Sequence, residues 1–182
     1  DNGKSTLLKW IYHPELVSDY VEYQGNISYS NDVLGYLPQE LAQEDKQKTI
    51  YEFFLDCDAF LDQSPKALGS YANQFNIPVE LFYSDQLMGS LSGGEKIKLQ
   101  LIRILMMSPT ILLLDEPSND LDLPSLELLE SIINEFDHIV LFISHDETLI
   151  ENTAKMIIHL EQLKRKTESR YTVVRKNYRQ YV

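Results

Sequence analysis

The second half of the chain alternates short apolar runs with segments of helical periodicity. Residues 111–114 and 139–143 are continuous apolar runs of strand length, which is typical of strands buried on both faces. Apolar residues also recur at helical spacing on either side of the first run. They are Ile97, Leu101, Ile104 and Leu105 before it, and Leu129, Ile132, Ile133 and Phe136 after it. This alternation predicts an α/β fold with a mostly parallel sheet flanked by helices.

The remaining strands and helices are marked less sharply. Residues 6–12 have a helical pattern that ends near Pro14, and residues 26–29 and 33–37 are short extended segments. Residues 156–160 form a further apolar run, which predicts another buried strand.

A helix-rich block interrupts this alternation. Helical segments are predicted at residues 49–61, 66–75 and 79–82. They fall within a block of about residues 40–90 that contains no strand pattern. We therefore predict a helical subdomain inserted into one domain, which comprises residues 1–182.

The composition is that of a soluble globular protein. Of 182 residues, 43% are apolar and 24% are charged, which fits one domain with a hydrophobic core. No apolar run approaches the roughly 20 residues of a membrane-spanning helix, so we expect no direct membrane insertion. A single cysteine, Cys57, excludes an internal disulfide framework and fits the reducing cytoplasm. We expect it to be a small buried side chain.

The net charge of −12 argues against non-specific binding of nucleic acid by the whole chain, because phosphate contacts need clustered Lys and Arg. Basic residues gather only near the C-terminus, at Lys164, Arg165, Lys166, Arg170, Arg175, Lys176 and Arg179. This cluster is either a solvated face or a local footprint on RNA.

Candidate chemistry begins at the first residues. Residues 3–6 (G-K-S-T) match the end of the phosphate-binding pattern G-x-x-x-x-G-K-[ST]. In that pattern backbone N–H groups surround the phosphates, Lys4 neutralises the β- and γ-phosphates, and Ser5 ligates Mg²⁺. The candidate nucleotide-binding residues are Asn2, Gly3, Lys4, Ser5 and Thr6. The alternative is an ordinary loop before a helix.

Two acidic residues follow the apolar run at 111–114. Asp115 would emerge at the carboxyl end of that strand, where α/β folds place ligands, and could hold a Mg²⁺-bound water. Glu116 could polarise the attacking water. Without the other motifs, the same residues could equally form a core strand that ends in a solvated acidic turn.

Residues 91–95 (L-S-G-G-E) are a second candidate phosphate site. Ser92 and Glu95 have the spacing of a capping box, which predicts that a helix begins here. Gly93 and Gly94 leave backbone N–H donors accessible and Ser92 adds a hydroxyl, so a γ-phosphate could bind. The alternative is a well-capped helix without a ligand.

Two single residues complete the set of candidates. Gln39 follows the extended segment at 33–37 and could reach Mg²⁺ or the attacking water. His145 follows the apolar run at 139–143 and could contact the γ-phosphate. Taken alone, a glutamine or histidine in such a place is more often structural.

The order and spacing of these motifs resemble the ABC ATPase family over nearly the whole chain. Each motif of the family has a counterpart: Walker A at residues 3–6, the Q-loop at Gln39, the signature at residues 91–95, Walker B and its catalytic glutamate at Asp115 and Glu116, the D-loop at residues 118–122, and the switch histidine at His145. The resemblance implies a P-loop NTPase-type fold, ATP and Mg²⁺ as ligands, and hydrolysis of ATP.

The resemblance also implies that two cassettes pair head to tail, because Walker A and the signature of one cassette cannot meet on one ATP. The residues that would serve this cassette's own nucleotide are Lys4, Ser5, Gln39, Asp115, Glu116 and His145. Of these, the metal would engage Ser5, Gln39 and Asp115, and the reaction would use Gln39, Glu116 and His145. The partner's nucleotide would meet Ser92, Gly93 and Gly94, and the nucleotide-binding set also includes Glu95 and Asp122.

A finer resemblance is to the ABC-F subfamily, whose members pair two cassettes in one chain, have no membrane domain and work on ribosomes. It rests on residues 35–40 (G-Y-L-P-Q-E), 91–96 (L-S-G-G-E-K) and 115–122 (D-E-P-S-N-D-L-D). The last segment departs from the usual D-E-P-T-N-H-L-D at Ser118 and Asp120. The resemblance implies a second cassette as a partner, and the ribosome or its RNA as a partner of parts outside this chain.

Both ends of the chain refine this expectation. Residues 157–181 are similar to the end of the first cassette in antibiotic-resistance ribosome-protection proteins, so that residues 164–182 would lead into an inter-domain linker. At the other end, the chain opens inside Walker A, and Asp1 stands where ABC ATPases usually have a glycine. We therefore expect an N-terminally truncated cassette that hydrolyses ATP poorly without its partner.

Two other functions remain open. An ATPase subunit of a membrane transporter often has a V-G-E-x-G-like segment before the signature, whereas residues 84–90 are S-D-Q-L-M-G-S. A non-catalytic module that only responds to ATP would not need Glu116 and His145, and both are present.

Overall fold

A three-stranded parallel sheet lies at the centre of the computed structural model, which describes residues 3–22, 25–162 and 169–174. Its strands are β1 (Leu34–Leu37), β2 (Ile111–Asp115) and β3 (Ile139–Ile143), in the order β1-β2-β3. Leu37 pairs with Leu114, and Asp115 pairs with Ile143, so that the carboxyl ends of all three strands share one edge. The strands predicted in these three segments are confirmed.

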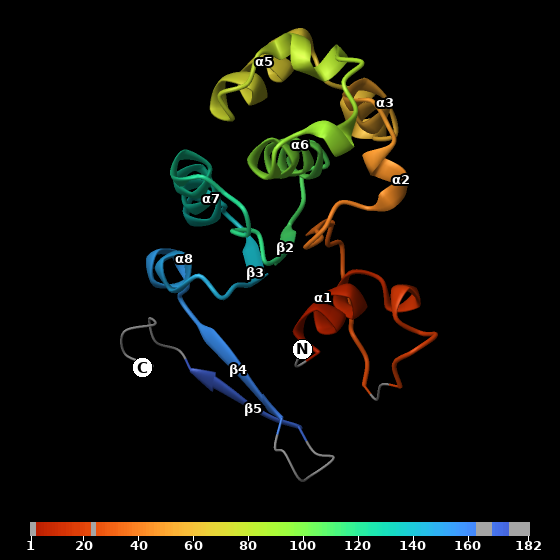
Figure 1. Ribbon diagram of the computed structural model, residues 1–182. Coiled ribbons are helices and arrows are strands. Elements are labelled where there is room, and N and C mark those ends of the chain that lie inside the picture. Colours follow the sequence, from red (N-terminus) through yellow and green to blue (C-terminus); the bar gives the residue numbers. More distant parts are fainter. Residues whose placement is uncertain (1–2, 23–24, 163–168, 175–182) are drawn as a thin grey trace.

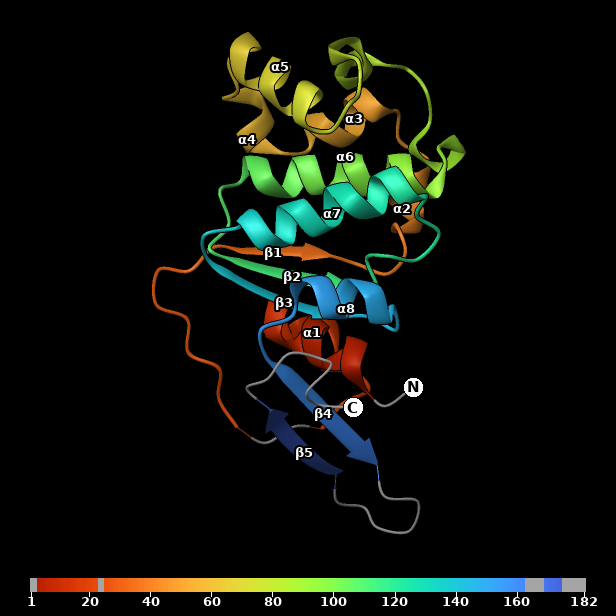
Figure 2. The same ribbon diagram turned by 90° about the vertical axis from the view of Figure 1, so that its left-hand side faces the viewer.

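Helices cover both faces of this sheet, as Figure 2 shows. On one face lies α1 (Lys4–Tyr12), which a 3-10 turn, η1 (Pro14–Leu16), follows. On the other face lie α6 (Gly93–Met106) and α7 (Leu123–Glu135), and α8 (Glu147–Thr153) follows β3. Along the chain, each of these helices comes before or after a strand of the parallel sheet. This alternation confirms the predicted α/β class.

Most of the helix-rich block lies on the far side of α6 from the sheet, while its first helix lies beside α6 (Figures 1 and 2). The block consists of α2 (Gln43–Lys46), α3 (Ile50–Leu55), α4 (Asp58–Leu61), α5 (Pro65–Gln74), η2 (Val79–Tyr83) and η3 (Met88–Ser90). All of them fall within the segment predicted as a helical insertion. The only pairing of strand type in this block is an isolated bridge between Thr49 and Leu87.

The predicted single helix at 49–61 is wrong, because the chain breaks it into α3 and α4. Cys57 has extended backbone angles (φ −113°, ψ 107°) and separates the two helices, as the N-cap of the second. In one straight helix, residues six apart would point about 120° away from each other. The break instead directs Phe54 and Phe60 into the same core, with ring centroids 5.2 Å apart.

One hydrophobic core runs from the helical block to the sheet. Phe54 and Phe82 in the block, Leu99 and Ile102 on α6, and Leu112 on β2 belong to a single cluster of buried side chains. Cys57 lies in the same cluster, which confirms that it is a small buried residue. Because α6 contributes to both sides, the block and the sheet are packed as one unit.

The end of the chain departs from the predicted pattern. β4 (Ile157–Gln162) pairs antiparallel with β5 (Ser169–Val174) in a separate hairpin, so the prediction of another buried strand at 156–160 is wrong. Met156 and Ile158 are 50% and 48% exposed, because in the described structure this hairpin has no layer over its apolar side chains.

Two predicted segments have no element that matches them. Residues 26–29 form no strand. Of residues 164–182, only 169–174 are described, as β5, and the side chains of the basic cluster lie outside the described residues. The assignment of this segment to a linker therefore stays a prediction. No helix in the described ranges is long and apolar enough to cross a bilayer.

The contact between β1 and α6 leaves no room for a side chain at Gly35, and we predict that Gly35→Ala destabilises the fold by about 1–3 kcal/mol. A Cβ at this position would lie 2.4 Å from Cγ2 of Ile104 and 3.2 Å from Cδ2 of Leu112. A matched control is Gly69→Ala on α5, where a Cβ would meet no atom within 4 Å. Because alanine favours helix, that variant should gain about 0.5–1 kcal/mol. Urea unfolding of both variants tests the packing, and equal midpoints would contradict it.

Candidate functional site

The predicted site residues gather at the edge where the parallel strands end. Asp115 is the last residue of β2, and Gln39 and His145 each follow the end of a neighbouring strand by two residues. The N-terminus of α1 comes to the same edge, where the Ser5 hydroxyl donates to Oδ1 of Asp115 at 2.9 Å. A hydrogen bond between residues 110 positions apart in sequence therefore joins the two halves of the site.

The start of α1 has the geometry of an anion site. Gly3 is its N-cap and has left-handed backbone angles (φ 72°, ψ 11°), which glycine adopts without strain. No side chain caps this helix, so the N–H groups of its first turn, which begins at Lys4, stay available to a ligand. Thr6 lies in the same turn, whereas Asn2 lies outside the described residues.

Glu116 and His145 form a pair at the same edge. His145 Nε2 lies 3.1 Å from Oε1 of Glu116, and the His145 backbone N–H donates to Oε2 at 3.2 Å. The Glu116 side chain is 8% exposed, whereas that of His145 is 78% exposed. The carboxylate is therefore buried, and one exposed residue contacts both of its oxygens.

The backbone at Glu116 is strained. Its φ of 50° lies in the left-handed region, which costs about 1–3 kcal/mol for a residue other than glycine. The conformation persists because the Glu116 N–H donates to the carbonyl of Ile143 at 2.9 Å, which continues the β2–β3 ladder past the last strand residue. Such strain at a buried carboxylate is typical of functional sites.

The start of α6 is capped by its own side chains. The Ser92 hydroxyl accepts from the Glu95 N–H at 3.3 Å and donates to the Glu95 carboxylate at 2.7 Å, which confirms the predicted capping box. These bonds from the side chain and backbone of Ser92 hold the pKa of Glu95 below its usual value. The carboxylate therefore stays ionised and keeps the cap in place down to acidic pH.

The two glycines of this segment pack against the loop before α7. A Cβ at Gly93 would lie 3.1 Å from the Asp120 carbonyl, and one at Gly94 would lie 3.0 Å from the Ser125 hydroxyl. Asp122 caps α7 by accepting from the Ser125 N–H at 3.1 Å. The structure thus places Ser92, Gly93, Gly94, Glu95 and Asp122 together at the joined starts of α6 and α7.

Gln39 is the least constrained of the predicted residues. It lies on an exposed bend after β1, and its side chain makes no hydrogen bond with any described residue. It shares the edge with Asp115 because β1 and β2 are parallel and in register, but the structure does not bring it into contact with the Ser5–Asp115 pair.

Sequence reasoning missed one link between two of its motifs. The Ser118 and Ser144 hydroxyls lie 3.1 Å apart, and Ser144 also accepts from the Asp146 N–H at 2.9 Å. This chain of bonds ties the loop after Glu116 to the turn that holds His145. No spacing rule could have found it, because the two serines meet only when β2 and β3 are side by side.

The oxygens at this edge suit a magnesium ion. Ser5 and the buried Asp115, which is 1% exposed, offer a hydroxyl and a carboxylate, the hard oxygens that Mg²⁺ prefers. Within the described residues, no group of three or more His, Cys, Asp or Glu side chains could hold a metal by itself. This is the usual situation for Mg²⁺ that binds through one or two protein groups, water and substrate phosphates.

A family model described as "ABC transporter" matches residues 2–119. The chain belongs to the ABC transporter family of ATPase domains. The ABC match ends inside the loop between β2 and α7, so it covers both partners of the Ser5–Asp115 bond and the start of α6.

Relatives of this ABC domain include two curated ATP-binding proteins. The chain is 34% identical over 160 residues to "ABC transporter F family member 5" of Arabidopsis thaliana, a match of 87% of this chain and 22% of that protein. It is 33% identical over 157 residues to "ATP-binding protein Uup" of Escherichia coli, covering 83% and 23% respectively. The chain therefore spans less than a quarter of the length of these relatives.

Solved structures confirm the fold. A structure titled "RNase-L Inhibitor" matches 93% of this chain and 32% of its own, with a TM-score of 0.67 and 25% identity. The archaeal ribosome recycling factor aABCE1, solved in complex with the ribosomal stalk protein aP1, matches with a TM-score of 0.66, 25% identity, and 93% and 31% coverage. The predicted ABC-type α/β architecture is thus confirmed, while the role of each site residue stays a prediction.

Proposed function

We propose that this chain binds and hydrolyses ATP as one cassette of an ABC-F protein that acts on the ribosome. The observation that supports this most is the bond between Ser5 and the buried Asp115, 110 residues apart, next to the Glu116–His145 pair. This geometry supports a site in which a helix N-terminus, a carboxylate proposed to bind metal and a candidate base lie around one point at the strand ends.

Each residue has a chemical role in this proposal. The uncapped start of α1, with Gly3, Lys4 and Thr6, binds the phosphates. Ser5 and Asp115 hold Mg²⁺, which neutralises charge on the phosphates when it is bound, and Gln39 joins them when the nucleotide is present. Phosphoryl transfer depends mainly on such positioning and charge stabilisation.

Glu116 orients and polarises the attacking water, and His145 contacts the γ-phosphate. Their mutual contact of 3.1 Å supports this division, because it holds the carboxylate and the imidazole side by side at the strand ends. The exposed His145 side chain can turn toward a nucleotide while its backbone N–H still donates to Glu116. Hydrogen bonds through Ser118 and Ser144 brace both segments.

A second cassette supplies the other half of each ATP site. The starts of α6 and α7 pack on each other, so that Ser92, Gly93, Gly94 and Glu95 lie beside Asp122 in one compact surface. In the proposal this surface receives the γ-phosphate bound by the partner. The protein would close on ATP and open after hydrolysis.

The ribosome is the proposed site of action in the cytoplasm. Relatives named as ABC transporter F family members and the likeness to aABCE1, solved with a ribosomal stalk protein, support it. The antibiotic-resistance role and the place of this chain as a first cassette belong to the same proposal. They rest on the resemblance of residues 157–181.

Glu116→Gln in the full-length protein is expected to leave ATP affinity within about twofold and to lower turnover by about 10²–10⁴-fold, the usual contribution of a general base. The change keeps the shape of the side chain and removes the charge that polarises water. Steady-state phosphate release and binding of a fluorescent ATP analogue measure the two effects. Similar turnover in mutant and wild type would contradict the role of Glu116.

Ser92→Ala and Thr49→Ala form a matched pair that tests the surface at α6. Both serve as N-caps in a capping box, so each change should cost about 1 kcal/mol of stability. Only Ser92→Ala should also lower ATP turnover, by about tenfold, because a hydrogen bond to a charged phosphate is lost. Thermal unfolding and phosphate release at saturating ATP give the comparison. Equal turnover in the two variants would show that the α6 start is only structural.

Full-length Glu116→Gln protein is expected to co-sediment with ribosomes in ATP and to be released in ADP. Because the variant cannot hydrolyse its ATP, the two cassettes should stay closed, and the closed state is the one proposed to bind the ribosome. Lys4→Ala is the control, because it weakens phosphate binding and should abolish the ATP effect. Recovery with membranes instead of ribosomes would favour a transporter subunit and overturn the proposed site of action.

A further inference from the structure

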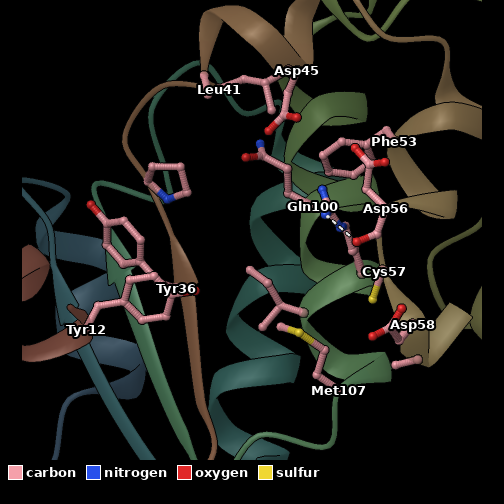
Figure 3. A pocket seen from close by; sticks show the side chains of 15 residues that line it. Tyr12, Tyr36, Leu41, Asp45, Phe53, Asp56, Cys57, Asp58, Gln100 and Met107 are labelled. Carbon is pink, nitrogen blue, oxygen red and sulfur yellow. Dashed lines mark hydrogen bonds between the residues drawn. The ribbon is translucent and has the colours of Figure 1, made fainter. Parts of the chain in front are cut away.

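Tyr36 is a partly buried tyrosine on the sheet face that carries the candidate site. It lies on β1, and its ring stacks on that of Tyr12 from α1, with centroids 5.0 Å apart and an angle of 28° between the planes. Figure 3 shows the two rings side by side, across the β1 strand from Gln100 and Met107. Both tyrosines border a cavity of about 640 Å³ that reaches α6 and the helical block.

The strand register brings Tyr36 close to Asp115. Tyr36 pairs with Leu113, two residues before Asp115 on the neighbouring strand. Since side chains alternate along a strand, Tyr36, Leu113 and Asp115 point to the same face, the one that α1 covers. The Ser5 hydroxyl, on α1, donates a hydrogen bond to Oδ1 of Asp115. Tyr36, on β1, lies close to the same carboxylate.

The Tyr36 hydroxyl is buried and has no hydrogen-bond partner among the described residues. Burial raises the pKa of this phenol, and the charge of the Asp115 carboxylate raises it further, because the hydroxyl lies close to that carboxylate. Unpartnered buried hydroxyls are rare in native proteins and call for an explanation. Phenylalanine would fill the same space without this cost.

We propose that Tyr36 is a positioning residue whose hydroxyl donates to Asp115 when that carboxylate engages the Mg²⁺–nucleotide complex. This inference rests on the proposed function. Groups that hydrogen-bond to a metal-bound carboxylate fix its direction and tune its affinity for the metal.

The test is Tyr36→Phe in the full-length Glu116→Gln protein, where no turnover disturbs binding. The affinity for a fluorescent ATP analogue is measured across a Mg²⁺ titration and in EDTA. We expect the Mg²⁺ concentration for half-maximal binding to rise about tenfold, with affinity in EDTA unchanged. The thermal midpoint should stay equal or rise, because an unpartnered hydroxyl has been removed. If Tyr36 were purely structural, the substitution would not change the Mg²⁺ dependence of binding while leaving the affinity in EDTA and the thermal midpoint unaffected.

Tyr71→Phe is the matched control, since Tyr71 is a partly buried tyrosine of α5 whose pKa burial also raises. It should leave the Mg²⁺ dependence unchanged. A Tyr36→Phe titration that overlays that of the parent within twofold would overturn the inference while the proposed function stands. A parent protein that shows no gain in ATP binding on addition of Mg²⁺ would instead refute the proposed function, and the inference with it.

Discussion

The hydrogen bond between Ser5 and Asp115 is the constraint on which the site depends. Asp115 is 1% exposed, and a buried carboxylate needs hydrogen bonds or a counter-charge to remain ionised. Ser5 can meet it only because α1 lies against the sheet with its N-terminus at the strand ends. The packing of α1 and the hydrogen bond to Asp115 therefore stabilise the same arrangement, which leaves the uncapped start of α1 at the strand ends.

Glu116, the residue after Asp115, combines backbone strain with a buried polar side chain. Glu116 has a left-handed backbone and a buried carboxylate, and its two oxygens contact His145. The β2–β3 ladder and the Ser118–Ser144 contact supply the fixed frame that holds this conformation. Among the described residues, the buried acidic side chains, Asp115 and Glu116, both lie at the strand ends.

Helix α6 joins this edge to the helical block. Its N-terminal glycines lie against the loop before α7, and its apolar face shares one core with Phe54 and Phe82. A displacement of the block would therefore be transmitted along a single rigid helix to the proposed partner-facing surface. The three-stranded sheet, by contrast, holds the residues proposed to act on this cassette's own nucleotide.

Much of this was determined by the sequence itself, since apolar runs at 111–114 and 139–143 and the capping box at Ser92 depend on local periodicity and spacing. The motifs also predicted the family. The break at Cys57 and the exposed hairpin of β4 and β5 were missed, because core geometry and strand pairing decide them. Only the tertiary structure places Ser118 beside Ser144 and Tyr36 near Asp115. Such contacts arise from the register of strands distant in sequence, and no local pattern encodes that register.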